Sequence, residues 1–145
     1  MDRRSALSGL LWGALPGLAW AAGAAPPVAA TDRRIEAVIR SQLQAFAADD
    51  ARKAYELAAP RIQQQFRTPE QFLAMVRQHY PVVYRHTAVH FLPPQRQGDR
   101  VLQQVHLTDG DDQVWIALYQ LERQADRKTW RITGCIVQES ELRYI

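Results

Sequence analysis

The chain has 145 residues and a formal net charge of +3, a length that fits one domain with a single hydrophobic core. Its basic residues are scattered, whereas a phosphate-binding surface clusters them on one face, so the composition speaks against nucleic acid as a partner. Cys135 is the single cysteine, which excludes an intramolecular disulfide, and we expect it to be a small buried hydrophobe.

The N-terminal segment has the composition of an export signal. Arg3 and Arg4 precede a run from Ser5 to Asp32 in which no charged residue occurs before the aspartate, and a basic start followed by an apolar run is typical of a cleavable signal sequence. The adjacent arginines also resemble a twin-arginine signal, with an ordinary basic start as the alternative. Because Pro16 and several glycines disfavour a permanent helix, cleavage is favoured over a retained membrane anchor.

Small side chains mark where the signal would be removed. Ala22-Gly23-Ala24 has the small-x-small pattern that signal peptidase accepts, and Ala19-Trp20-Ala21 is the second choice. The expected organisation is a signal peptide over residues 1–24, a linker over 25–31 and one α+β domain over 32–145. The mature protein is then expected to be periplasmic or secreted, without stable insertion in a membrane.

Two helices are predicted at the start of the domain. From Asp32 onward, apolar residues recur at spacings of three and four, which predicts an amphipathic helix. Asp49-Asp50 supplies the N-cap and the first-turn acid of a second helix, which is expected to stop at Pro60.

A third helix and a sheet follow. Thr68 is the expected N-cap, with Pro69 at the first helical position, and Pro81 is expected to end the helix and start the alternating pattern of strands. The fold class is therefore α+β, with three N-terminal helices packed on a curved four-stranded antiparallel sheet. The strands are expected over residues 87–92, 100–108, 113–122 and 129–138.

The sheet suggests a pocket when its residues are sorted by face. If the loop between the second and third strands has two or four residues, Gln104 and His106 share a face with Trp115 and Tyr119. This mixed polar and aromatic set, with Tyr84 at its rim, predicts a site for a small apolar or amphipathic ligand, or a surface that pairs with a second copy of the chain. Coverage of both faces by the chain's own helices and loops is the third interpretation.

No metal site or cofactor is predicted. His86 and His90 fall in an extended segment, where four residues span roughly 13 Å, so one ion cannot reach both. His79 and His106 have no cysteine or carboxylate at ligand spacing. The aspartates near Gly110 are explained by a hairpin turn, since the spaced ligands of a calcium loop are missing.

The mature sequence resembles the exported bacterial proteins of the domain of unknown function 4864 family. The similarity extends over nearly the whole mature chain. The elements that carry it are Gln42 with Ala45-Phe46, Asp49-Asp50, Pro60, Phe66, Phe72 with Met75-Val76, Val83-Tyr84-Arg85, and Trp130-Arg131-Ile132 with Gly134-Cys135.

That family looks akin to the nuclear-transport-factor-2-like, or SnoaL-like, group, whose cone-shaped α+β domains agree with the element order above. The resemblance implies an isomerase, a dehydratase, a hydrolase or a binding module, because the wider group includes all of these. Its enzymes place an acid in the pocket, whereas the expected inner strand positions here offer no carboxylate. We therefore expect a non-enzymatic module that binds a small ligand or a partner protein. The alternatives are a cofactor-independent isomerase or dehydratase, with His106 as base and Tyr84 or Tyr119 as hydrogen-bond donor, and a structural dimerisation domain.

Overall fold

The computed structural model of the chain describes residues 10–13 and 30–143. Most of the expected signal peptide and linker lies outside the described residues. The helices of the described part are α1 (Ala30–Ala47), α2 (Ala51–Glu56), α3 (Pro60–Gln63), α4 (Pro69–His79) and α5 (Pro81–Tyr84). Its strands are β1 (Leu10–Gly13), β2 (Ala88–Phe91), β3 (Gln95–Gln97), β4 (Arg100–Thr108), β5 (Gln113–Arg123) and β6 (Trp130–Arg143).

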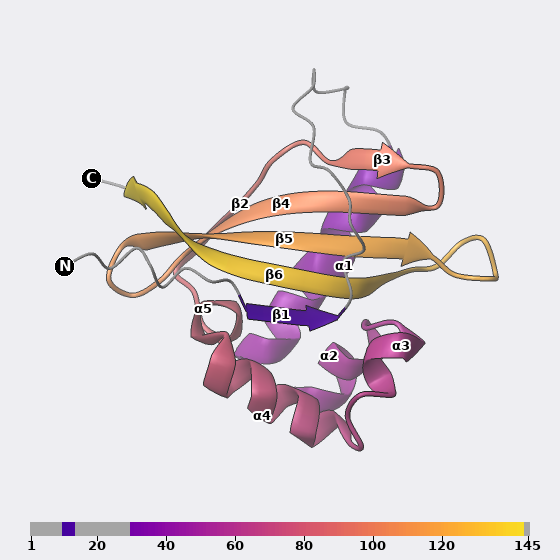
Figure 1. The fold of residues 1–145 in the computed structure, drawn as a ribbon, viewed down its shortest axis with the longest axis horizontal. Coiled ribbons are helices and arrows are strands. Elements are labelled where there is room, and N and C mark those ends of the chain that lie inside the picture. The colour runs from indigo at the N-terminus through magenta and orange to yellow at the C-terminus, as the bar shows by residue number, and fades with distance from the viewer. Residues whose placement is uncertain (1–9, 14–29, 144–145) are drawn as a thin grey trace.

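The strands form one open antiparallel sheet. Among the described residues its order is β1-β6-β5-β4-β2. The short β3 pairs with the first residues of β4, on the same edge as β2. Figure 1 shows α1 running behind the curved sheet, while α2 to α5 gather beside the β1 and β6 edge. The predicted α+β class with helices on an antiparallel sheet is confirmed.

The predicted caps Asp50 and Thr68 are also confirmed, whereas α2 has no acidic residue in its first turn. Oδ1 of Asp50 accepts a hydrogen bond from the amide of Lys53 over 3.1 Å at the start of α2. Oγ1 of Thr68 accepts from the amide of Gln71 over 3.1 Å at the start of α4. Both caps satisfy amides that have no partner within their own helix, which explains why short local patterns predicted them.

Two prolines start short helices. Pro60 and Pro81 each occupy the first position of a short helix, α3 and α5, where the sequence predicted a helix end and no further turn. A proline fits this position because its fixed φ is helical and its missing N–H would have no helical partner. The expectation of three helices is therefore too low for the described part of the chain.

The core lies between α1 and the sheet. Phe46, Trp130 and Ile132 are buried, as the sequence predicted, and so is the thiol of Cys135. The ring of Phe72 lies 5.8 Å from that of Phe46, which joins α4 to α1.

Backbone hydrogen bonds connect the short helices to the sheet. The amide of Ala59 donates to the carbonyl of Ile132 over 2.7 Å, and the amide of Ile132 donates to the carbonyl of Leu57 over 2.9 Å. The fully buried amide of Gln42 donates to the carbonyl of Ala54 over 3.0 Å and holds α1 against α2. These contacts attach the segment after α2 to β6 and hold α2 against α1.

The β4–β5 hairpin has an odd-length loop. Thr108 pairs with Val114, and the amide of Asp109 donates to the carbonyl of Gln113 over 3.0 Å. Within the loop, Asp112 has φ 61°, the left-handed conformation found in three-residue hairpin loops. Odd positions of β4 therefore share a face with odd positions of β5, and the expectation of a two- or four-residue loop is wrong.

A bulge changes which positions of β6 face the core. Gln120 pairs with Gly134 and Leu121 pairs with Ile132, so Thr133 is an extra residue on β6. Even-numbered residues of β6 are therefore buried before the bulge, and odd-numbered residues are buried after it. These core residues are Trp130, Ile132, Cys135 and Val137.

Candidate functional site

The five residues expected to line one pocket lie in three separate places. Gln104 and His106 take even positions of β4, whereas Trp115 and Tyr119 take odd positions of β5, so the register puts the two pairs on opposite faces. Tyr84 is the last residue of α5, outside the sheet. The single concavity predicted from hairpin parity is therefore not formed, because the loop has an odd length.

Trp115 and Tyr119 face the core. Tyr119 is fully buried, and Trp115 packs against the core while its Nε1 donates to Oδ2 of Asp109 over 2.9 Å. Burial raises the pKa of Tyr119 well above its ordinary value, and the neighbouring Cys135 raises it further. The phenol stays protonated, and both aromatic side chains serve packing.

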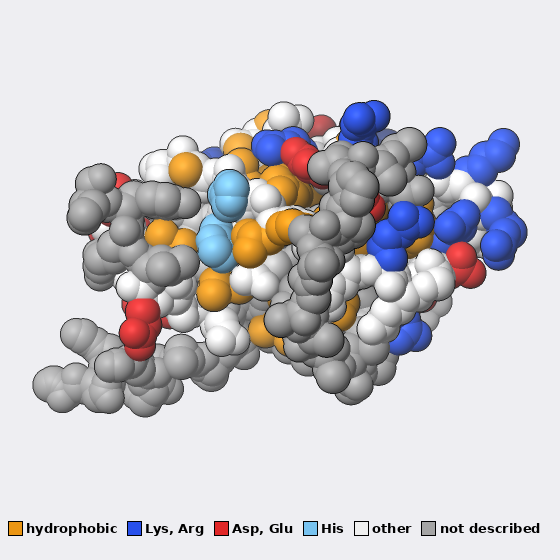
Figure 2. Space-filling view, turned by 90° about the horizontal axis from the view of Figure 1, so that it is seen from above, with side chains coloured by type: hydrophobic (Ala, Val, Ile, Leu, Met, Phe, Trp, Pro, Cys, Tyr) orange, Lys and Arg blue, Asp and Glu red, His pale blue; other side chains and the backbone are white. Residues whose placement is uncertain are grey.

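Gln104 and His106 lie on the opposite face, away from the main core. The amide nitrogen of Gln104 is 3.4 Å from Nε2 of His106, and His106 pairs directly with His90 of β2. Burial lowers the pKa of His106, and the charge of His90 lowers it further. In Figure 2, the pale blue histidine side chains on this side of the molecule lie among hydrophobic and uncharged groups.

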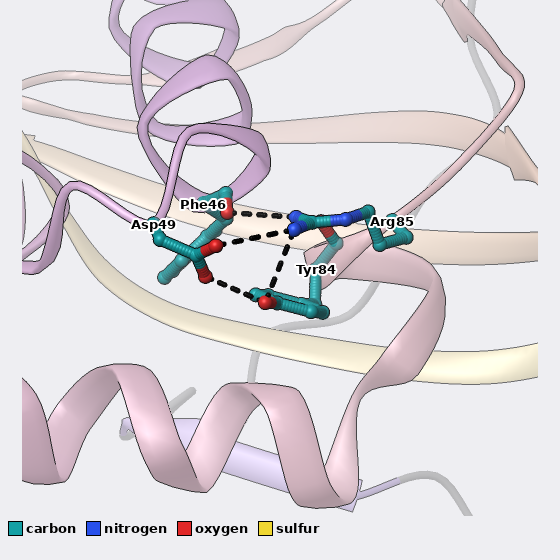
Figure 3. A network of polar contacts seen from close by, with 4 residues as sticks. All are labelled: Phe46, Asp49, Tyr84 and Arg85. Carbon is teal, nitrogen blue, oxygen red and sulfur yellow. Dashed lines mark hydrogen bonds and ion pairs between the residues drawn. The ribbon is translucent and has the colours of Figure 1, made fainter.

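Tyr84 belongs to a polar cluster that joins α1 to α5 (Figure 3). Its phenol donates to Oδ1 of Asp49 over 2.5 Å, and Nη2 of Arg85 lies 3.3 Å from Oδ2 of the same carboxylate. Nη1 of Arg85 donates to the carbonyl of Phe46 over 3.0 Å. The guanidinium also lies over the Tyr84 ring, with Cζ 4.0 Å from the centroid. This cluster fixes the orientation of Arg85.

Asp49 receives these contacts because the chain turns sharply there. Its φ is 56°, a left-handed conformation that aspartate tolerates better than most residues, and its amide donates to the carbonyl of Phe46 over 3.0 Å. The hydrogen bond from Tyr84 is the main reason for the lowered pKa of Asp49, and the charge of Arg85 adds to the effect. A carboxylate with a lowered pKa is a weak base, so Asp49 suits a structural role better than general-base catalysis.

A hollow of about 200 Å³ lies beside this cluster and is open to solvent. Its polar lining residues are Arg40, Arg85, Gln44 and His86. The remaining lining is apolar and consists of Leu43, Ala47 and Val89. Two cationic and three apolar residues around one hollow are a combination that suits an amphipathic anion.

One face of α1 builds most of the hollow. Four lining residues follow one another along α1 at spacings of three, one and three, which places them on the same side of the helix. They are Arg40, Leu43, Gln44 and Ala47. Nε of Arg40 is 2.8 Å from Oε2 of Glu36, one turn earlier on α1.

The opposite wall comes from the residues after α5. Burial lowers the pKa of His86, an effect that a hydrogen bond with the Val82 backbone partly opposes. His86 is therefore neutral at neutral pH, and its imidazole can donate or accept a hydrogen bond. The charge of the hollow then comes from Arg40 and Arg85.

A second hollow, of about 230 Å³, has paired charges. It is lined by Gln97 and two arginine and carboxylate pairs. Nε of Arg123 lies 3.2 Å from Asp99, and Nε of Arg100 lies 3.7 Å from Glu122. Because its own lining contains as many carboxylates as arginines, whereas the lining of the first hollow contains no carboxylate, this hollow attracts an anion less strongly than the first.

Metal-ligating and reactive groups are sparse in the part of the chain that the structure describes. No cluster of three or more His, Cys, Asp or Glu side chains in residues 10–13 and 30–143 could hold a metal ion. Burial raises the pKa of Cys135, so its thiol is protonated and inert. No helix in the same ranges is both long and apolar enough to cross a membrane.

The fold and the hollow define a small α+β domain in which the hollow, lined by two arginines, lies beside an open antiparallel sheet. The chain belongs to the family described as a domain of unknown function (DUF4864), whose model matches residues 28–145. No curated protein and no solved structure matches the chain. The family resemblance drawn from the sequence is thereby confirmed, and two of the elements that carried it, Asp49-Asp50 and Val83-Tyr84-Arg85, meet in the cluster of Figure 3.

Sequence reasoning missed the hollow and assigned Asp49 to the start of α2. Asp50 alone caps that helix, while the Asp49 carboxylate turns to Tyr84 and Arg85. One signal in the sequence could have pointed to the site, because Asp49-Asp50 and Val83-Tyr84-Arg85 are both among the elements that carry the family resemblance. The contact between them links residues 36 positions apart, which local patterns do not predict.

Proposed function

We propose that the chain is the precursor of an exported protein and that its domain belongs to the nuclear-transport-factor-2-like group. The uncharged run before Asp32 supports export. Helices that precede an open antiparallel sheet support the grouping. On this proposal, cleavage after Ala24 removes strand β1, which pairs with β6 in the full-length chain.

We propose that the domain binds a small amphipathic anion, such as a carboxylate with a short apolar chain, in the hollow between α1 and α5. The observation that carries this proposal is that two arginines, Arg40 and Arg85, line the same hollow as three apolar residues, which are Leu43, Ala47 and Val89. Guanidinium groups form charge-assisted hydrogen bonds with carboxylates, and an apolar floor takes up the hydrocarbon part.

The cluster around Asp49 supports a preformed site. Arg85 is held by a carboxylate, a main-chain carbonyl and an aromatic ring, so little side-chain entropy is lost when a ligand arrives. Arg40 is positioned in a similar way, with Glu36 at its Nε and the Phe91 ring 4.6 Å from its Cζ. Each arginine therefore presents its guanidinium in a defined direction.

Binding is favoured over catalysis by the placement of the candidate acid and base groups. A base and a hydrogen-bond donor that act together must both come within about 3 Å of the reacting atoms. His106 and Tyr119 lie on opposite faces of the sheet, and Tyr84 is engaged with Asp49 on α1. The isomerase or dehydratase alternative has no comparable support.

Titration with hexanoate, with hexanol as the uncharged match, tests the binding proposal. We expect hexanoate to shift the amide NMR signals of Leu43, Ala47 and Val89, and hexanol to bind more weakly. Arg40→Ala and Arg85→Ala should each weaken hexanoate binding roughly fivefold, since a charge-assisted hydrogen bond at a half-exposed site is worth about 1 kcal/mol.

Arg96→Ala is the matched control, because it removes the same charge from an exposed position on β3. Its affinity for hexanoate should equal that of the unmodified protein. Equal binding of hexanol and hexanoate, or equal losses in the Arg96 and Arg40 variants, would refute the proposal.

A further inference from the structure

A pair of histidines lies on the sheet face opposite the core. His90 of β2 is directly opposite His106 of β4, and their ring centroids are 6.1 Å apart. His90 is exposed and His106 is half-buried, so both rings can be reached from solvent. The pair does not belong to the hollow, whose lining includes neither residue.

Strand pairing holds the two histidines in place. The register from Ala88 with Thr108 to Phe91 with Val105 is continuous, and the pair lies within it. Backbone hydrogen bonds extend the pairing at both ends, from the Thr87 amide to the Thr108 carbonyl over 2.8 Å and from the Leu92 amide to the Gln104 carbonyl over 3.1 Å. A ligand that joins the two rings therefore needs only side-chain rotation.

The spacing of the rings fits a shared metal ion. Metal–nitrogen bonds of about 2.0–2.1 Å place the centroids of two imidazoles on one ion roughly 5 to 6 Å apart. The observed 6.1 Å is just above that range, so a small rotation of the side chains brings both rings to one ion. With the amide nitrogen of Gln104 as donor over 3.4 Å, Nε2 of His106 is the unprotonated nitrogen, which is the form that binds a metal.

We propose that His90 and His106 form a two-imidazole site for a late first-row divalent transition metal ion, with water completing the coordination. Imidazole ligands select Cu²⁺, Ni²⁺ and Zn²⁺ over Mg²⁺ and Ca²⁺, and the expected order of affinity places Cu²⁺ first. The described residues add no third His, Cys, Asp or Glu to the pair. The ion is therefore exchangeable and does not support the fold, unlike a four-ligand structural zinc.

Isothermal titration calorimetry of the untagged full-length protein with CuCl₂ tests this site. His90→Ala and His106→Ala should each lower the affinity for Cu²⁺ at least about tenfold, because each removes one of two protein ligands. MgCl₂ should give no measurable binding. His79→Ala is the matched control, since it removes an exposed histidine from α4, and it should leave the affinity unchanged.

Thermal unfolding without metal checks that the variants are folded. Both positions are on an accessible face, so the melting temperatures of the variants should stay close to that of the unmodified protein. If His106→Ala is unstable, His106→Gln serves as a second variant. Affinities within twofold of the unmodified protein for both ligand variants, or an equal loss in His79→Ala, would overturn the site. These outcomes are independent of hexanoate binding, which involves neither histidine.

Discussion

The phenol of Tyr84 donates a hydrogen bond to Oδ1 of Asp49 over 2.5 Å and connects the end of α5 to the end of α1. The acceptor is a carboxylate, so this hydrogen bond depends on the charge of Asp49. Its strength is therefore expected to depend on pH, unlike hydrogen bonds between neutral groups.

Tyr84→Phe should lower the melting temperature at pH 7 and have almost no effect near pH 2. The pKa of Asp49 is lowered in the folded protein, so its contribution to stability is complete above the unfolded pKa of about 3.9 and is lost as the pH falls through the folded value. Thermal unfolding of both proteins across this range provides the measurement.

Tyr55→Phe is the control for that experiment. The Tyr55 phenol donates to the carbonyl of Gln63 over 2.7 Å, which is a neutral acceptor. The loss of stability in this variant should be the same at both pH values. A Tyr84→Phe effect that is equally constant would show that Asp49 is not the partner that matters.

Trp130→Ala should lower the free energy of unfolding by about 3 kcal/mol, because it removes a large buried side chain and leaves a cavity. Trp130 is 4% exposed, at the start of β6. Urea unfolding measures the change, with exposed Arg127→Ala as the comparison. A loss below about 1 kcal/mol would mean that Trp130 is not a core residue in solution.

Acidification from pH 7.5 to 5 should destabilise the protein through His86. Burial lowers the pKa of His86 in the folded state, so stability is complete above the unfolded value of about 6.5 and declines as the pH falls below it. His86→Asn removes the titrating group, so its free energy of unfolding should fall less over this range. The same decline in both proteins would exclude His86 as a source of the pH dependence.

N-terminal sequencing of the exported protein should give a start at Ala25, or at Ala22 if the second site is used. The small-x-small patterns before these residues are the basis of this expectation. Full-length protein recovered from the membrane fraction would instead show that the segment is retained as an anchor.

Local sequence signals predicted the three longest helices but neither the short helices α3 and α5 nor the site. Asp50 and Thr68 are read correctly because a helix cap needs only a side chain and an amide three residues later. The loop between β4 and β5 is different, since Asp109 can stabilise loops of several lengths and the sequence does not specify which one forms. That single choice reversed the predicted faces of Trp115 and Tyr119 relative to His106.

The candidate sites depend on contacts between distant segments. Arg40 and Arg85 meet only because α5 packs beside α1, and no repeated spacing along the chain connects them. His90 was compared with His86, its neighbour in sequence, whereas its actual neighbour is His106 on the adjacent strand. Pairing between strands, which the sequence determines only through the whole fold, decides such cases.

The extra residue at Thr133 affects how insertions and deletions are tolerated in this family. Removing it would leave Ile132 opposite Leu121 and Gly134 opposite Gln120, so β6 would pair without a bulge at this point and Cys135 would still face the core. A relative that lacks one residue here can therefore keep the same interior, whereas a one-residue deletion elsewhere in β6 would turn the following core side chains to the other face. Alignments of the C-terminal strand should place their gaps with this constraint in mind.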